Sequence, residues 1–256
     1  MTVLHRPYTR IVKNAETAVL FIHGIVSTPQ HFEKMIARLP ENCSVMNLLL
    51  AGHGGTARDF CHGSMALWQM QVDSALTYLA MGHRRVLMVG HSMGTLLAMR
   101  SALRYPGCTS AMLLLDTPLR IRVTPMAVVN SLHLGLRLPL PENQEFLAAR
   151  DSFGVEPTRN PFAYLGWLKR YEELFRLSTR MRGEFGALNV PCVAFQSRKD
   201  EMVAPSSAAL LQTNPYCHVE MMEHAYHFWY APEEEERIMT ALKRLAVGEN
   251  PAENGA

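Results

Sequence analysis

The sequence lacks several features that would place it in a specialised class of protein. It has no block of consecutive lysines and arginines, and its formal net charge is only +2, which argues against nucleic acid as the main partner. No run of about 18 apolar residues occurs, and residues 1–7 contain no apolar stretch of the length that a signal peptide needs. We therefore expect a soluble, cytoplasmic protein with no integral membrane segment.

Cysteine is also scarce and scattered. The chain has five cysteines and no Cys-x-x-Cys pair. An odd, dispersed set of this kind fits reduced thiols in a cytosol better than a disulfide framework or a zinc site.

Apolar runs that alternate with helical segments predict an α/β domain, for which 256 residues are enough. Unbroken apolar runs are typical of strands that are buried on both faces, and strand–helix alternation implies a parallel sheet that helices cover on both sides. The strands predicted in this way lie near residues 18–22, 45–50, 86–89, 111–115, 192–195 and 217–222, with an edge strand possible at 8–12. Thr28-Pro29 predicts a helix that runs to about residue 39.

The alternation stops after about residue 118 and resumes at about residue 188. Between them we predict amphipathic helical segments, two of which begin at Thr124-Pro125 and Asn160-Pro161. The second has Tyr164, Leu168, Tyr171 and Phe175 on one face. We interpret this segment as a helical cap over the carboxyl ends of the strands, where open sheets bind ligands. The predicted division is a core of 1–118 and 188–247, a cap of 119–187 and a flexible tail of 248–256.

The chain is organised around the sequence Gly90-His91-Ser92-Met93-Gly94, which follows an apolar strand and opens a helix. A sharp strand-to-helix turn of this Gly-x-Ser-x-Gly form holds a serine hydroxyl clear of the sheet, where a base can reach its proton. The simpler interpretation is a glycine-rich turn that happens to contain a serine, but the strand before it and the helix after it favour a nucleophile. The amides of Met93 and of Ile25, in the His23-Gly24-Ile25 turn, are the candidate oxyanion-hole donors.

A serine nucleophile needs a histidine base and a carboxylate, which in this turn geometry follow it in the order acid, then histidine. Asp200 lies just beyond the strand at 192–195, and Asp116, which ends the strand at 111–115, is the alternative acid. His224 and His227 both lie after the last strand. A His-x-x-His metal site is disfavoured, because the sequence places no third ligand.

With these residues in place, the chain resembles the α/β-hydrolase superfamily from about residue 18 to 246. It resembles most the small bacterial carboxylesterases and thermostable monoacylglycerol lipases, which carry a helical cap after the sixth-strand position of a mostly parallel sheet. Five stretches carry the resemblance: His23-Gly24-Ile25, the loop 48–54 followed by Asp59, Gly90–Gly94, Arg198–Val203, and Ala225-Tyr226-His227 followed by Pro232-Glu233. Arg58 replaces a proline that is common in the family, and Ala225 replaces its usual serine.

The resemblance selects His227 rather than His224, because the family has a small residue two positions before the base and an acidic, helix-opening segment about five after it. It implies hydrolysis of carboxylic esters, either short- to medium-chain acyl esters or monoacylglycerol, by Ser92, His227 and Asp200, with Ile25 and Met93 as oxyanion donors. It implies a small-molecule substrate and no cofactor or metal. Feruloyl-type esterase, peptidase, C–C hydrolase or acyltransferase chemistry stays open within the fold, as does a non-catalytic ligand-binding role.

Overall fold

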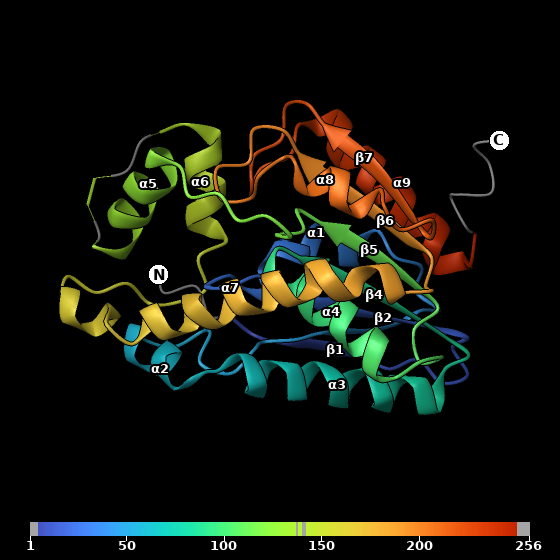
Figure 1. Ribbon diagram of the computed structural model, residues 1–256. Helices are drawn as coiled ribbons and strands as arrows, with labels where there is room; N and C mark the ends of the chain where they lie inside the picture. Colours follow the sequence, from blue (N-terminus) through green and yellow to red (C-terminus); the bar gives the residue numbers. More distant parts are fainter. Residues whose placement is uncertain (1–4, 137, 140–141, 250–256) are drawn as a thin grey trace.

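The apolar runs of the sequence form the middle of a seven-stranded sheet in the computed structural model, which describes residues 5–136, 138–139 and 142–249 (Figure 1). Its strand order is β1-β3-β2-β4-β5-β6-β7. The strands are β1 (Tyr8–Arg10), β2 (Thr17–Ile22), β3 (Ser44–Asn47), β4 (Arg85–His91), β5 (Ala111–Leu115), β6 (Cys192–Ser197) and β7 (Cys217–Met222). All neighbours are parallel except the edge strand β1, which pairs with β3 in antiparallel orientation.

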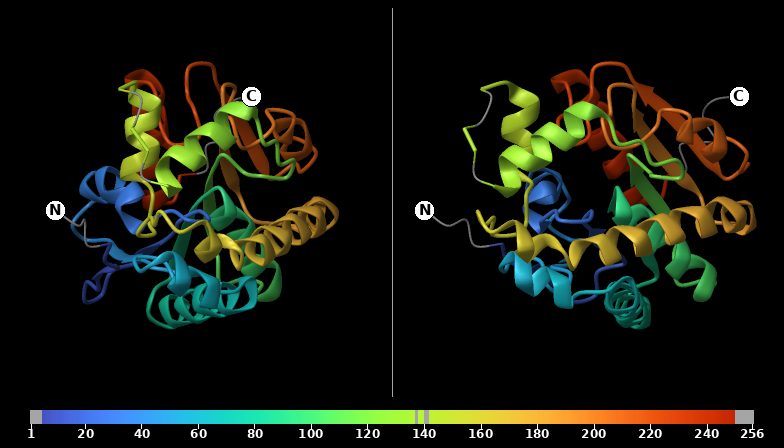
Figure 2. Two further views of the ribbon diagram at one scale, coloured as in Figure 1. Left: turned by 90° about the vertical axis from the view of Figure 1, so that its left-hand side faces the viewer. Right: turned by 60° about the vertical axis from the view of Figure 1, so that its left-hand side comes forward.

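Helices cover both faces of the sheet (Figures 1 and 2). They are η1 (Pro29–Phe32), α1 (Glu33–Ala37), α2 (Ala57–His62), α3 (Met65–Gly82), α4 (Met93–Arg104), α5 (Pro125–Gly135), α6 (Gln144–Asp151), η2 (Pro161–Tyr164), α7 (Trp167–Glu184), η3 (Phe185–Ala187), α8 (Ser207–Leu211) and α9 (Pro232–Val247). The apolar side chains of α3, α4, α7 and α8 pack in one core. Those of α1 and α9 pack in a second core on the opposite face.

Most predicted elements are present, with two differences in length. The strand predicted at 45–50 ends at Asn47, because the chain leaves the sheet there and Leu50 packs into the core from the following loop. The single helix predicted from Pro29 to about Leu39 is a 3₁₀ turn followed by a short α-helix that ends at Ala37. Thr28 does cap it, since its hydroxyl accepts a hydrogen bond from the Gln30 amide.

The apolar face noted after Asn160 is only partly buried. Tyr164 and Tyr171 pack against the core, but Leu168 is 70% exposed and Phe175 is 46% exposed. The buried face of α7 consists of Trp167, Arg170, Leu174, Leu177, Ser178 and Met181. This face contacts α2, α3 and α4, so the neighbouring helices, rather than the strongest aromatic spacing, decide the orientation.

Residues 119–187 contain only helices and connecting segments among the described residues, and they are joined to loops at the carboxyl ends of the strands. The Arg122 amide donates to the Met202 carbonyl oxygen at 2.8 Å, beyond β6. The Gly154 amide donates to the Val26 carbonyl oxygen at 2.8 Å, beyond β2. Helices α5 and α6 lie beside each other, away from the sheet (Figures 1 and 2).

Two other features bear on the sequence predictions. The five cysteines are free thiols. Within the described ranges, no helix combines the length and the apolar character that crossing a membrane requires. Helix α9 ends at Val247 and Gly248 terminates it in the left-handed conformation, whereas residues 250–256 of the predicted flexible tail lie outside the described residues.

Candidate active site

Ser92 lies at the corner between β4 and α4, at the carboxyl end of the central strand. Its backbone φ is +51°, a conformation that is strained for a residue with a side chain. A Cβ at Gly90 would lie 2.7 Å from the Thr95 nitrogen, and a Cβ at Gly94 would overlap the Ile22 carbonyl oxygen. The two glycines are therefore needed for the close approach of strand and helix that forms this corner.

Strained backbone is concentrated near this corner. Val26, Ser92 and Asp116 have φ values between +48° and +51° and lie just beyond β2, β4 and β5. Such conformations persist where the surrounding structure holds them, and they cluster at functional sites. The carboxyl edge of the sheet is therefore where we expect a functional site.

His227 and Asp200 come together at this edge. Nδ1 of His227 lies 2.7 Å from Oδ2 of Asp200, and both side chains are buried. The other carboxylate oxygen of Asp200 accepts hydrogen bonds from the amides of Met202 and Val203, each at 2.7 Å. The turn after β6 thus fixes the carboxylate, and the carboxylate fixes the orientation of the imidazole.

Two contacts hold the loops of this region against the Ser92 corner. Nε2 of His91, the residue before Ser92, donates a hydrogen bond to the His227 carbonyl oxygen at 2.8 Å. On the other side, a Cβ at Gly24 would lie 3.1 Å from Cβ of Ser92. The base loop and the His23-Gly24-Ile25 turn therefore both lie beside the serine.

The predicted oxyanion donors lie in this same region. Met93 is the first residue of α4, so its N–H has no acceptor within the helix. Ile25 follows the glycine that touches Ser92. Their role as oxyanion donors stays a prediction, since it depends on a bound substrate.

The structure separates the alternatives that the sequence left open. His224 is exposed, and its amide donates to Oε1 of Glu234 at 3.0 Å, whereas His227 is buried against Asp200. Asp116 is fully buried, but its Oδ1 accepts from the Ser197 amide at 2.7 Å rather than from His227. Asp200 is therefore the carboxylate that pairs with the imidazole.

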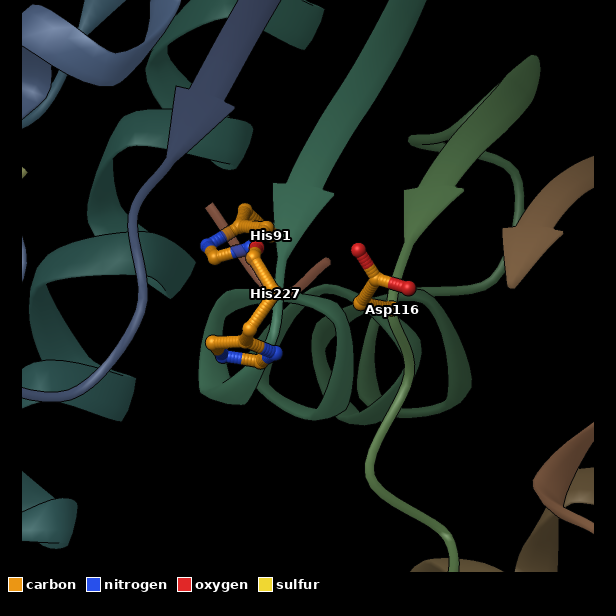
Figure 3. Close-up of side chains that lie close together, drawn as sticks. All are labelled: His91, Asp116 and His227. Atoms are coloured by element: carbon orange, nitrogen blue, oxygen red, sulfur yellow. The ribbon is translucent and has the colours of Figure 1, made fainter. Parts of the chain in front are cut away.

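A different trio of side chains lies close enough to surround a metal ion. One ligand atom each of His91, Asp116 and His227 lie within 4.8 Å of one another (Figure 3). However, Nε2 of His91 and Nδ1 of His227 already form hydrogen bonds with protein oxygens. The arrangement is therefore explained by hydrogen bonding, and we assign no metal site to it.

Electrostatics favour a proton on the base. Burial alone lowers the pKa of a histidine, but the charge of Asp200 and its hydrogen bond outweigh burial and raise the pKa of His227 to about 9. The neighbouring His91 differs, because burial holds its pKa well below the usual value and keeps its ring neutral. The site thus has one histidine that can carry charge beside a histidine that serves as a neutral hydrogen-bond donor.

Sequence reasoning did not identify two residues that hold the base. His91 was noticed only as part of the Gly-x-Ser-x-Gly motif, and its partner is 136 positions away, a distance that no local pattern can reveal. Glu201, next to Asp200, accepts a hydrogen bond from the His227 amide at 3.3 Å. Burial raises the pKa of Glu201. In the sequence, only its position next to Asp200 could have indicated this role.

The site is closely covered. Ser92 is 6% exposed. A surface cavity of about 610 Å³ lies elsewhere, between α2 and the loop that precedes η2, and Ser92, Asp200 and His227 do not line it. Access to the serine is therefore narrow in this conformation.

Comparisons with known proteins identify the family. A sequence model described as "Alpha/beta hydrolase family" matches residues 19–239. No curated protein matches the chain in sequence.

Solved structures share the fold at low identity. The lipolytic enzymes LipS and LipT, from a metagenome, are represented by a structure with 18% identity and a TM-score of 0.71, over 94% of this chain and 96% of that one. A monoacylglycerol lipase of Paleococcus ferrophilus has 18% identity and a TM-score of 0.68, over 94% of this chain and 99% of that one. Est1E of Butyrivibrio proteoclasticus, with ferulic acid bound, has 19% identity and a TM-score of 0.61, over 95% of this chain and 94% of that one. These similarities concern the fold, and together with the family match over residues 19–239 they show that the chain belongs to the α/β-hydrolase family.

Proposed function

We propose that the protein hydrolyses carboxylic esters, with Ser92 as the nucleophile, His227 as the general base and Asp200 as the acid that orients the base. The observation that carries the proposal is the buried hydrogen bond between His227 and Asp200, held beside the strained corner that carries Ser92. Serine, histidine and carboxylate in this arrangement are the components of acyl transfer.

In the proposed reaction, Nε2 of His227 takes the proton of the Ser92 hydroxyl while Nδ1 keeps its own proton toward Asp200. The serine oxygen attacks the ester carbonyl, and the amides of Ile25 and Met93 donate to the oxyanion that forms. The imidazolium then gives its proton to the departing alcohol, which leaves an acyl-enzyme. Water, deprotonated by the same base, releases the acid and restores Ser92. These steps use no metal or organic cofactor.

We further assign residues 119–187 as a cap on a core formed by 1–118 and 188–247. Its support is the pair of hydrogen bonds to the loops after β2 and β6, two loops that contain proposed site residues. The substrates that we propose are short- to medium-chain acyl esters or monoacylglycerol. The low exposure of Ser92 favours the short chains, because long ones need more room around the serine.

Turnover of p-nitrophenyl esters from acetate to laurate tests the proposal. The wild type should hydrolyse them, fastest at short chain length, and Ser92→Ala should reduce kcat by about 10⁴-fold or more. Ser74→Ala, which removes a hydroxyl from an exposed position of α3, should leave the rate unchanged. Absence of hydrolysis by the wild type, or equal rates for the wild type and Ser92→Ala, would show that the proposal is wrong.

A further inference from the structure

A second acid lies close to the proposed base and has no part in the mechanism above. Asp116 follows β5 directly, its side chain is fully inaccessible to solvent, and its backbone φ is +50°. Figure 3 shows its carboxyl group beside the imidazole of His227, where β4 and β5 end. The fold therefore holds a strained, buried acid in the region that contains the base.

Two neighbours hold the carboxyl group of Asp116 in place. Its Oδ1 accepts from the Ser197 amide at 2.7 Å, and the buried hydroxyl of Tyr230 faces the same carboxyl group and interacts with it. Neither group is a cation, so these contacts fix the position of the acid without supplying an opposite charge.

Four ionisable side chains surround this carboxyl group: Asp200, His227, His91 and Tyr230. Burial and then the charge of Asp200 raise the pKa of Asp116 well above its usual value, against the opposing effects of His227 and Ser197. Two acids that share a buried site favour one proton between them. Asp200 accepts three hydrogen bonds from its surroundings, whereas burial favours the protonated form of Asp116.

We propose that Asp116 is a reserve positioning acid for His227, able to carry the negative charge that pairs with the imidazole when Asp200 cannot. Removing the charge of Asp200 removes one of the two causes that keep Asp116 protonated. Its proton then leaves to solvent, and the carboxylate stabilises the imidazolium that forms when His227 accepts the serine proton. Asp116 acts only through His227, and this inference rests on the ester hydrolysis proposed above.

The test compares Asp200→Asn, Asp116→Asn and the double variant with the wild type, by p-nitrophenyl ester hydrolysis across pH. Asparagine suits both positions, because its oxygen can still accept from the amides that each aspartate serves and because it tolerates the left-handed conformation of residue 116. Loss of the orienting acid of a triad typically reduces kcat by about 10⁴-fold. With Asp116 in reserve, we expect Asp200→Asn to lose only about 10²-fold, and the second substitution to lower that rate by at least a further ~10-fold.

A merely structural role of Asp116 predicts a different pattern. In that case Asp116→Asn lowers the rate by the same factor in the wild type and in Asp200→Asn, whereas a reserve acid gives a much larger factor in Asp200→Asn. Asp200→Asn should also show an additional rise of rate with pH, as Asp116 loses its proton, and the double variant should not. Equal factors in the two backgrounds, or no such rise in Asp200→Asn, would overturn the inference.

Titration of the His227 imidazole by NMR gives a readout that does not depend on turnover. Adding Asp116→Asn to Asp200→Asn should lower the pKa of His227, because the remaining negative charge is lost. An unchanged pKa overturns the reserve role even if esters are hydrolysed. A lowered pKa in a protein that hydrolyses no ester overturns only the proposed function, so the two failures are distinguishable.

Discussion

The ring of His91 donates a hydrogen bond from Nε2 to the backbone carbonyl oxygen of His227, at 2.8 Å, and so connects the strand that carries Ser92 to the loop that carries the base. His91→Phe keeps a ring of similar shape and removes this bond. An unpaired buried carbonyl group costs about 1–3 kcal/mol, so we expect the loop to shift and kcat to fall by about 10- to 100-fold.

His83 offers a matched control for this substitution. Its Nε2 lies 2.8 Å from the Ser44 hydroxyl, and His83 precedes the start of β4, at the opposite end of this strand from Ser92. His83→Phe should lower the melting temperature but leave kcat near that of the wild type. If the two variants lose kcat equally, or if His91→Phe loses none, the bond does not position the base.

The two histidines after β7 should differ sharply in their effect on activity. His227→Ala removes the imidazole that pairs with Asp200 and should reduce kcat by several orders of magnitude. His224→Ala removes an exposed side chain and should cost little. Steady-state kinetics of both variants decides the assignment, and the reverse ranking would make His224 the base.

The pH dependence of activity should reflect the raised pKa of His227. A general base must be neutral to accept a proton, so kcat/KM should rise as pH increases through the pKa of the free enzyme's base. The midpoint should lie above the 6.5 of an ordinary histidine and close to about 9. In Asp200→Asn the midpoint should move down, because the carboxylate charge that raises it is lost. A wild-type midpoint at or below 6.5 would contradict the pairing.

The contact between the 119–187 segment and the loop after β2 can be tested at Gly154. A Cβ at this position would overlap the Ser27 carbonyl oxygen. Gly154→Ala should therefore separate the 119–187 segment from the loop after β2, which also contains Ile25. We expect a loss of about 2 kcal/mol in stability, a melting temperature lower by about 4–8 °C, and a lower kcat/KM.

Gly183, within α7, is the matched control, because a Cβ there has no neighbour within 4 Å. Alanine is a better helix former than glycine by about 1 kcal/mol, so Gly183→Ala should raise the melting temperature slightly and leave kcat/KM unchanged. Equal effects of the two substitutions would show that the contact at Gly154 does not matter.

Elements of the fold could be predicted from the sequence where neighbouring residues alone determine them. The run Ala111–Leu115 is apolar throughout and forms a strand with those bounds. Leu50, equally apolar, is buried from a loop, because burial alone does not distinguish a strand from a packed turn. The buried face of α7 did not follow from its sequence, because more than one apolar stripe fits it and only the helices beneath it select one.

The candidate site shows the same limit. Chain order and turn geometry were enough to propose Ser92 and to place Asp200 and two histidines after later strands, whereas the choice of His227 over His224 came from the resemblance to the family. The nearness of Asp116 to His227 depends on which strand ends become neighbours and on how their loops turn. Such relationships arise from tertiary packing and have no counterpart in the local sequence.

Covalent labelling with an alkyl fluorophosphonate, with the labelled residue located by mass spectrometry, tests whether Ser92 is the nucleophile. We expect a single adduct on Ser92, loss of esterase activity in proportion to labelling, and labelling slower by orders of magnitude in His227→Ala. An adduct on a different residue, or continued ester hydrolysis after Ser92 is fully labelled, would show that Ser92 is not the nucleophile.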